Sequence, residues 1–72
     1  MFTDKEIGAR VAQIRERTGW KQVALGVALG FKRRQTAHDI EVGRRKLRFS
    51  EAIELAAIFD VPLTELVPRE EP

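Results

Sequence analysis

Hydrophobic residues recur at helical spacing in the first part of the chain. Three large aliphatic side chains, four and three residues apart, fall on one side of a helix: Ile7, Val11 and Ile14. Thr3, three positions before Glu6, matches a capping box, in which each side chain bonds the backbone N–H of the other residue. Gly19 suits the end of this helix, because helices often finish at a glycine in the left-handed conformation. The pattern predicts a first helix over residues 4–18.

A tandem repeat follows, with the sequence Val23-Ala24-Leu25-Gly26 and then Val27-Ala28-Leu29-Gly30. As a helix it places Leu25 and Leu29 on one ridge and Val23 and Val27 on roughly the opposite one. Two four-residue strands would lack a turn between them and a third strand to pair with, so a helix is favoured. Gly30 is suited to cap this second helix.

A third helix is predicted over residues 33–42, with Gly43 at its end. Ala37, Ile40 and Val42 supply its expected buried side. Arg34, Gln35, His38 and Asp39 share a different side, because they are three or four positions apart.

The last part of the chain predicts two more helices. Ser50 is the expected N-cap of a fourth helix, in which Ile53, Ala56 and Ala57 share a face that Leu55, Ile58 and Phe59 broaden. Pro62 suits the first turn of a short fifth helix through residue 67. The fold class is therefore all-α, with five short helices in one domain over residues 1–68 and a frayed acidic tail over residues 69–72.

Four aromatic residues are expected in the core: Trp20, Phe31, Phe49 and Phe59. For Phe2 two alternatives stay open, a frayed position and packing on the fifth helix. Whether Val23 and Val27 are exposed or covered also stays undecided at this point. Two exposed valines would form an apolar ridge that suits a protein partner.

Charge is distributed unevenly along the chain. Residues 1–31 carry five basic and three acidic groups, residues 32–48 seven basic and two acidic groups, and residues 50–72 one basic and six acidic groups. The net charges of these segments are therefore +2, +5 and −5. The middle segment would attract a polyanion, which the last segment would repel.

Composition excludes several function classes. The chain has no cysteine and a single histidine, His38, so neither disulfides nor a metal centre is expected. No nucleophile–base pair, phosphate-cradling loop or cofactor motif is recognisable, so an enzyme is not expected. No apolar stretch approaches the roughly 20 residues of a membrane span, and the first residues do not resemble a secretory signal. A cytoplasmic protein is the expectation.

The second and third predicted helices form a helix-turn-helix, joined by Gly30-Phe31-Lys32. A small apolar back would fix the angle of the third helix, and its polar front would face the edges of DNA bases. Arginine can bond guanine in bidentate fashion and glutamine can bond adenine. Asp39 would either accept a hydrogen bond from cytosine or orient a neighbouring arginine.

Three segments resemble the phage repressor and Cro family. They are Gln22-x-x-Leu25-Gly26-x-x-Leu29-Gly30-Phe31, Ile40-Glu41-x-Gly43-Arg44-Arg45, and Leu55-Ala56-x-Ile58-Phe59-x-Val61-Pro62-Leu63-x-Glu65-Leu66. They occur in order and at near-correct spacing, and the resemblance as a whole covers residues 7–67. The resemblance implies a five-helix DNA-binding fold whose third helix reads the major groove, and many members of the family repress transcription as homodimers on operators.

The resemblance also assigns roles to residues. Gln22 matches a glutamine that touches a phosphate and braces the reading helix, and Arg44 and Arg45 match a basic pair that grips the DNA backbone. Arg15 and Glu41 match a structural ion pair between the first and third helices. The expected DNA-binding residues are Gln22, Lys32, Arg33, Arg34, Gln35, Thr36, His38, Asp39, Arg44, Arg45 and Lys46. For His38, a base or phosphate contact and simple solvent exposure remain alternatives.

Three departures from the family pattern affect these assignments. One extra residue lies between Gly30 and Glu41, so either Arg33 or Arg34 is the first base reader. Gly26 stands where alanine is usual, at a cost of up to about 1 kcal/mol in helix propensity. The family often caps its fourth helix two residues before Ser50.

The sequence thus predicts a sequence-specific regulator of transcription that binds double-stranded DNA, at an inverted-repeat operator, as a homodimer. The fourth and fifth helices are the expected dimer surface. The alternative is a protein-interaction module on the same scaffold, an antitoxin or antirepressor, which would use Val23 and Val27 or the C-terminal helices.

Overall fold

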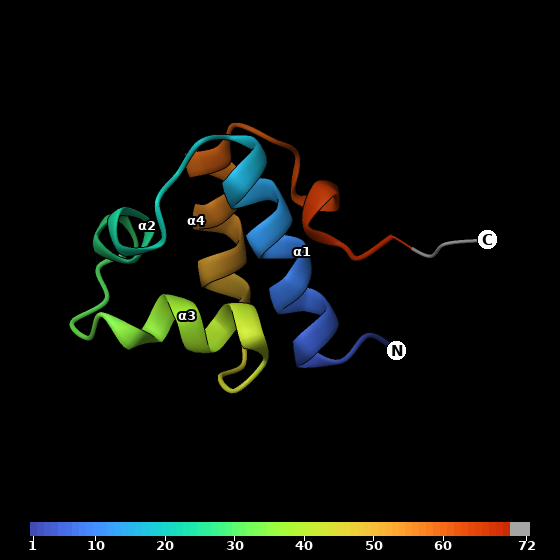
Figure 1. Ribbon diagram of the computed structural model, residues 1–72. Helices are drawn as coiled ribbons and strands as arrows, with labels where there is room; N and C mark the ends of the chain where they lie inside the picture. The colour runs from blue at the N-terminus through green and yellow to red at the C-terminus, as the bar shows by residue number, and fades with distance from the viewer. Residues whose placement is uncertain (70–72) are drawn as a thin grey trace.

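The computed structural model describes residues 1–69 and contains four α-helices and one 3-10 turn (Figure 1). The helices are α1 (Asp4–Arg17), α2 (Gln22–Ala28), α3 (Gln35–Val42) and α4 (Phe49–Phe59), and the 3-10 turn is η1 (Leu63–Leu66). The prediction of five helices was wrong in its last element, because only four residues follow Pro62 in a helical turn. Most of the predicted tail, residues 70–72, lies outside the described residues.

Helix α1 begins for the predicted reason, and α1 and α2 both end beside the predicted glycines. Thr3 Oγ1 accepts from the backbone N–H of Glu6 at 3.1 Å, and the Thr3 N–H donates to Glu6 Oε1 at 3.0 Å, which completes the capping box. Gly19 and Gly30 follow α1 and α2 with φ angles of 84° and 78°. In both turns a glycine therefore reverses the chain where a side chain would be strained.

A cluster of buried apolar side chains holds the helices together: Val11, Ile14, Leu25, Leu55, Phe59 and Leu66. Ala37 and Ile40 of α3 are also buried, as predicted, but Val42 is 41% exposed, so its assignment to the buried side was wrong. Trp20 packs on the edge of the core and is half-buried.

Helix α1 crosses α3 at a glycine. A Cβ atom at Gly8 would lie 2.0 Å from the carbonyl oxygen of Ile40 and 2.8 Å from that of Glu41. The two backbones therefore contact each other directly, and this contact sets the distance between α1 and α3 at their crossing. Figure 1 shows α3 running across the molecule beside the first turns of α1.

Helix α4 differs most from its prediction. It begins at Phe49 with Arg48 as its N-cap, two residues before the predicted cap at Ser50, as the family pattern suggested. Its buried residues are Glu51, Leu55 and Phe59, and it presents Ile53 to solvent at 50% exposure. Phe49 is 72% exposed, so the core assignment of this residue was wrong, as was the buried face built on Ile53 and Ala57.

Candidate nucleic-acid interface

Helix α3, which the sequence predicts to read the major groove, is shorter than predicted. It begins at Gln35 rather than near residue 33, with Arg34 as its N-cap and Arg33 in a bend before it. Because α2 ends at Ala28, the connection covers residues 29–34, longer than the three or four residues usual in a helix-turn-helix. The extra residue therefore lengthens the turn and does not extend the helix.

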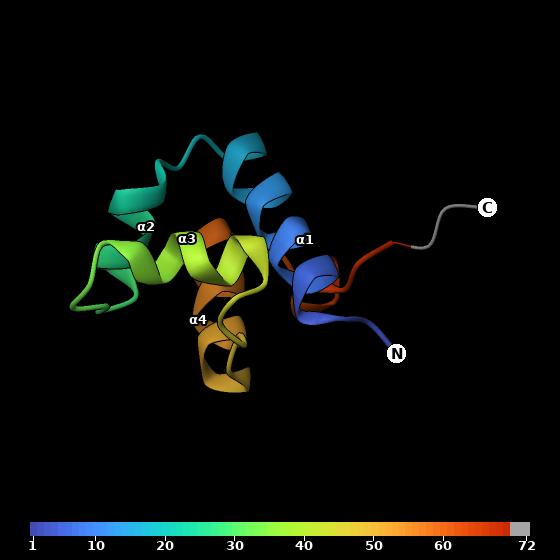
Figure 2. The same cartoon turned by 60° about the horizontal axis from the view of Figure 1, so that its bottom comes forward.

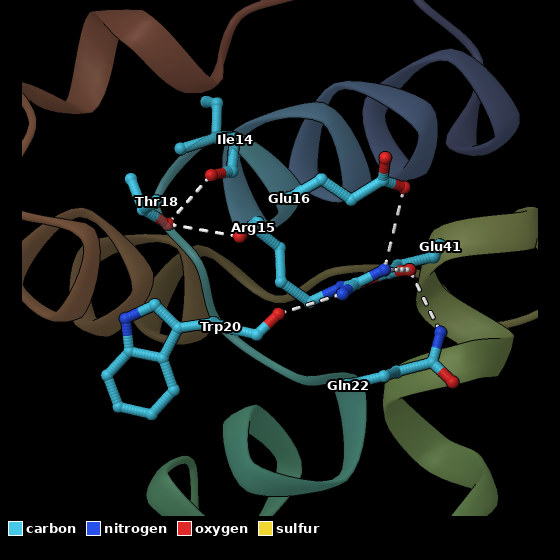
Figure 3. A network of polar contacts seen from close by, with 7 residues as sticks. All are labelled: Ile14, Arg15, Glu16, Thr18, Trp20, Gln22 and Glu41. Atoms are coloured by element: carbon cyan, nitrogen blue, oxygen red, sulfur yellow. Dashed lines mark hydrogen bonds and ion pairs between the residues drawn. The ribbon is translucent and has the colours of Figure 1, made fainter.

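A polar network fixes the inner side of α3 (Figure 3). Arg15 Nε donates to Glu41 Oε2 at 2.6 Å, and Arg15 Nη2 donates to Glu41 Oε1 at 3.2 Å. Gln22 Nε2 donates to the same Oε1 at 2.9 Å, and Arg15 Nη1 donates to the carbonyl oxygen of Trp20 at 2.9 Å. One carboxylate on α3 is thus tied to both α1 and the first residue of α2.

This network confirms the predicted Arg15–Glu41 pair and the bracing role of Gln22. The Glu41 side chain is 7% exposed and that of Arg15 is 15% exposed, so water screens the pair little. The hydrogen bonds that Arg15 donates to Glu41 raise the pKa of Arg15 above its ordinary value. The expected phosphate contact of Gln22 stays a prediction. In this structure its amide nitrogen donates to Glu41.

No other helix within residues 1–69 covers the outer side of α3 when the molecule is turned as in Figure 2. Gln35 is exposed, whereas Thr36, His38 and Asp39 are half-buried. Arg34 is exposed and its backbone is helical, with φ −59° and ψ −34°, which aligns it with His38 one turn later. The structure therefore brings together the polar front that the sequence predicted.

Exposed cations flank both ends of this front. Lys32, Arg33 and Arg34 precede α3 and Lys46 follows it, and none of these side chains forms an ion pair within 4 Å among residues 1–69. Arg44 is also exposed and lies 3.9 Å from Asp39, a loose surface contact that is worth little in water. These groups remain available to a polyanion.

Arg45 is held differently from the arginine beside it. Its Nη1 and Nη2 donate to the two carboxylate oxygens of Glu51 at 2.7 and 2.9 Å, and its guanidinium lies 5.2 Å from the centre of the Phe31 ring. Its expected grip on the DNA backbone stays a prediction, and its observed role is to fasten the loop after α3 to α4.

Glu51 also caps α4, because its Oε1 accepts from the backbone N–H of Arg48 at 2.9 Å. Burial alone would raise the pKa of Glu51, but the hydrogen bonds from Arg45 and Arg48 outweigh burial, so the pKa is lowered. This pair was not predicted from the sequence. The signal is present once the helix start is placed at residue 49, since Glu51 then occupies the third helical position, where a capping carboxylate is common.

A second pair that was not predicted ties α1 to η1. Arg10 is buried, and its guanidinium donates to the Glu65 carbonyl oxygen at 2.7 Å and to Glu65 Oε2 at 2.8 Å. Arg10 follows Ile7 by three residues and precedes Ile14 by four, so it lies on the apolar stripe of α1. A charge within an apolar stripe is the sign in the sequence that indicates such a buried ion pair.

Within residues 1–69 no three His, Asp or Glu side chains are grouped so as to hold a metal ion. None of the described helices is long and apolar enough to cross a membrane.

Residues 6–68 match the helix-turn-helix domain family. The chain belongs to that family. It is a family of DNA-binding regulators rather than enzymes, and the polar front of α3 lies where such a domain presents its reading helix.

Solved structures support the assignment. The chain is similar to the restriction-modification controller protein C.AhdI from Aeromonas hydrophila, with a TM-score of 0.79 and 25% sequence identity over 89% of this chain and 96% of that one. It is also similar to the DNA-binding domain of BldD, with a TM-score of 0.77 and 25% identity over 94% of this chain and 100% of that one. No curated protein sequence matches the chain. The chain is therefore a helix-turn-helix DNA-binding domain that is similar to transcriptional controllers.

Proposed function

We propose that this chain is a sequence-specific transcriptional regulator of the repressor and Cro type. It inserts α3 into the major groove of an inverted-repeat operator and binds as a homodimer, with two copies of α3 about 34 Å apart along one side of the duplex. The observation that carries the proposal is the contrast between the two sides of α3. The Arg15–Glu41–Gln22 network fixes the inner side, while the outer side presents exposed or half-buried polar groups between exposed cations.

The helix boundary favours Arg34 over Arg33 as the first base reader. Arg34 continues the helical line of α3, so its side chain starts from the same surface as Gln35 and His38. Lys32 and Arg33 lie in the turn before the helix, where a cation meets the phosphates that border the groove. Arg44 and Lys46 serve the opposite end of α3 in the same way.

Two substitutions separate base reading from phosphate binding. Gln35→Ala removes an exposed amide and costs roughly 1–3 kcal/mol at one base pair, with little change on random DNA. Arg44→Ala weakens binding to every sequence and lowers the slope of log affinity against log salt by about 0.9 for each phosphate that is no longer neutralised. Arg69→Ala is the matched control, because it removes an exposed arginine near η1 and far along the chain from α3.

The measurement is a titration of each variant on a site selected from random duplexes and on an unselected duplex, at several salt concentrations. The symmetry of the selected site also tests the homodimer. Equal losses from Gln35→Ala on both duplexes would refute the reading role of α3. A slope for Arg44→Ala no different from that of Arg69→Ala would refute the phosphate contact.

One observation favours the alternative, a protein-interaction module such as an antitoxin or antirepressor. Val23 and Val27 of α2 are 49% and 72% exposed, so the rest of residues 1–69 leaves both side chains open to a partner. They border a hollow of about 290 Å³ that Phe31 and the cations of residues 32–34 also line. A stable partner retained at high salt and lost in Val27→Lys would support this module, since salt weakens phosphate contacts far more than apolar ones.

A further inference from the structure

Helix α4 is apolar on two opposite sides. One side supplies Leu55 and Phe59 to the core. The other presents a stripe of residues four positions apart, all of them exposed: Phe49, Ile53 and Ala57. A helix that is apolar on opposite sides is normally covered on both, and here only one side is covered by residues 1–69.

The exposed stripe continues into a groove beside it. The groove has a volume of about 370 Å³, and Phe49 lines it together with Phe2, Leu63 and Val67. Leu63 and Val67 are themselves exposed. Phe2, left open by the sequence, therefore borders η1 and is half-buried. A contiguous apolar patch of this kind marks an interaction surface.

We propose that a second copy of this chain covers the stripe, with its own α4 packed antiparallel and Ile53 on the two-fold axis. The proposal rests on the homodimer proposed above and specifies how the two copies meet. A two-fold interface joins the same patch on both subunits, so the patch must be complementary to itself. The stripe meets this condition, because the large Phe49 and the small Ala57 lie at equal distances on either side of Ile53. Antiparallel packing sets Phe49 against the partner's Ala57.

The charges at the ends of α4 favour the same orientation. Arg48 precedes the helix and Asp60 ends it, and neither side chain forms an ion pair within 4 Å among residues 1–69. An antiparallel pair brings Arg48 of one copy toward Asp60 of the other and opposes the two helix dipoles favourably. A parallel pair would instead place the cations beside each other and set Phe49 against Phe49.

The absence of cysteine from the sequence allows a direct test by disulfide cross-linking. Ile53→Cys places two identical positions on the axis, within the short Cβ–Cβ distance that a disulfide requires, and is expected to form a covalent dimer under mild oxidation. Phe49→Cys and Ala57→Cys are each expected to cross-link poorly alone and readily when the two chains are mixed. Val27→Cys is the matched control, because it is as exposed as Phe49 but lies on α2.

Ile53→Glu gives a second readout that does not depend on disulfide geometry. It places two carboxylates on the axis and is expected to weaken the dimer by at least about 30-fold, the loss typical of a central interface residue. Sedimentation of the wild type near twice the 8.2 kDa chain mass, and of Ile53→Glu near that mass, would support the interface. Circular dichroism checks that each variant is folded.

The outcomes separate this inference from the proposed function. Cross-linking of Phe49→Cys to itself, or an Ile53→Glu variant that remains dimeric, overturns the antiparallel interface while operator binding can still hold. A wild type that stays monomeric both free and on its site overturns the interface and the homodimer together. A dimer that cross-links as expected but binds no duplex leaves the interface intact and refutes the DNA-binding function.

Discussion

The arginines before α3 and the arginines around the core carry the same guanidinium group in opposite surroundings. Arg10, Arg15 and Arg45 each meet a carboxylate at 2.6–2.8 Å, and their side chains are buried or half-buried. Arg33 and Arg34 are exposed and form no ion pair among residues 1–69. The position of an arginine in a basic stretch therefore says little about its role. Arg44 and Arg45 are neighbours in sequence, yet one is open to a ligand and the other fastens α4.

The paired arginines fix how α3 is presented. Arg15 ties α3 to α1 through Glu41, and Arg45 ties the loop that follows α3 to α4 through Glu51. A reading helix must be held rigidly if its side chains are to meet base edges in register. The cations that form no ion pair among the described residues can remain flexible, because phosphates are recognised by charge more than by geometry.

The largest expected effect is that of removing Glu41, the carboxylate of the Arg15–Glu41 pair. Glu41→Ala removes the close carboxylate partner of the partly buried Arg15 and the acceptor of Gln22, so we expect a loss of about 3–5 kcal/mol in the free energy of unfolding. Urea denaturation measures this change. Glu16→Ala is the matched control, because its exposed carboxylate lies 3.7 Å from Arg15 and should cost less than about 0.5 kcal/mol. Similar losses from both variants would remove the distinction between the two arginine groups.

Loss of the Arg45–Glu51 pair should lower the free energy of unfolding by less, and the contribution of this pair should depend on pH. Glu51→Gln weakens the bonds from Arg45 and Arg48, and we expect a loss of about 1–2 kcal/mol at pH 7, because the Arg45 side chain is 29% exposed. The pKa of Glu51 is lower in the folded chain than in the unfolded one. Its contribution is therefore complete above the ordinary glutamate pKa of about 4.3 and is lost as the pH falls through the lower folded value.

Unfolding curves between pH 7 and pH 3 check this prediction. The wild type should lose stability more steeply below about pH 4.5 than Glu51→Gln, because only the wild type has this carboxylate to protonate. Parallel pH profiles for the two proteins would show that Glu51 does not titrate differently in the folded state.

The sequence predicted the parts of this structure that local rules determine. The capping box at Thr3, the glycines that end α1 and α2, and the apolar stripes to which the buried Ile14 and Leu25 belong follow from short patterns within single elements. The Arg15–Glu41 pair joins residues 26 positions apart and was predictable only through the resemblance to repressors.

The errors share a different cause. The start of α3 depended on how the extra residue in the turn was accommodated, which the tertiary contacts of α2 and α3 decide. The exposed side of α4 was misassigned because apolar residues on both sides of a helix give no indication of which side faces the core. Gly8 was not recognised as the crossing point of α1 and α3, because a contact between two backbones leaves no apolar pattern in the sequence.

A smaller effect of opposite sign is expected where α2 packs on α3. A Cβ atom at Gly26 would lie 3.7 Å from Ala37 Cβ and 3.9 Å from the Phe31 ring, which is ordinary van der Waals contact. Gly26→Ala should therefore stabilise the chain by about 0.5–1 kcal/mol, through helix propensity and a less flexible unfolded state. Gly8→Ala is the same chemical change at the crossing with α3 and should destabilise it. Thermal unfolding of both variants tests the contrast, and a Gly26→Ala variant that melts below the wild type would contradict it.

The smallest effect on stability is expected for the exposed Arg33. Arg33→Ala removes an exposed guanidinium that no residue in the range 1–69 pairs with, so the free energy of unfolding should change by less than about 0.5 kcal/mol. Its affinity for duplex DNA should fall on every sequence, with a shallower salt dependence. Arg15→Ala should have the opposite effect, with a large loss in the free energy of unfolding and a smaller loss of DNA affinity. If Arg33→Ala lowers the free energy of unfolding as much as Arg15→Ala, the exposed cations contribute to folding. The distinction between arginines that stabilise the fold and arginines that bind DNA would then be wrong.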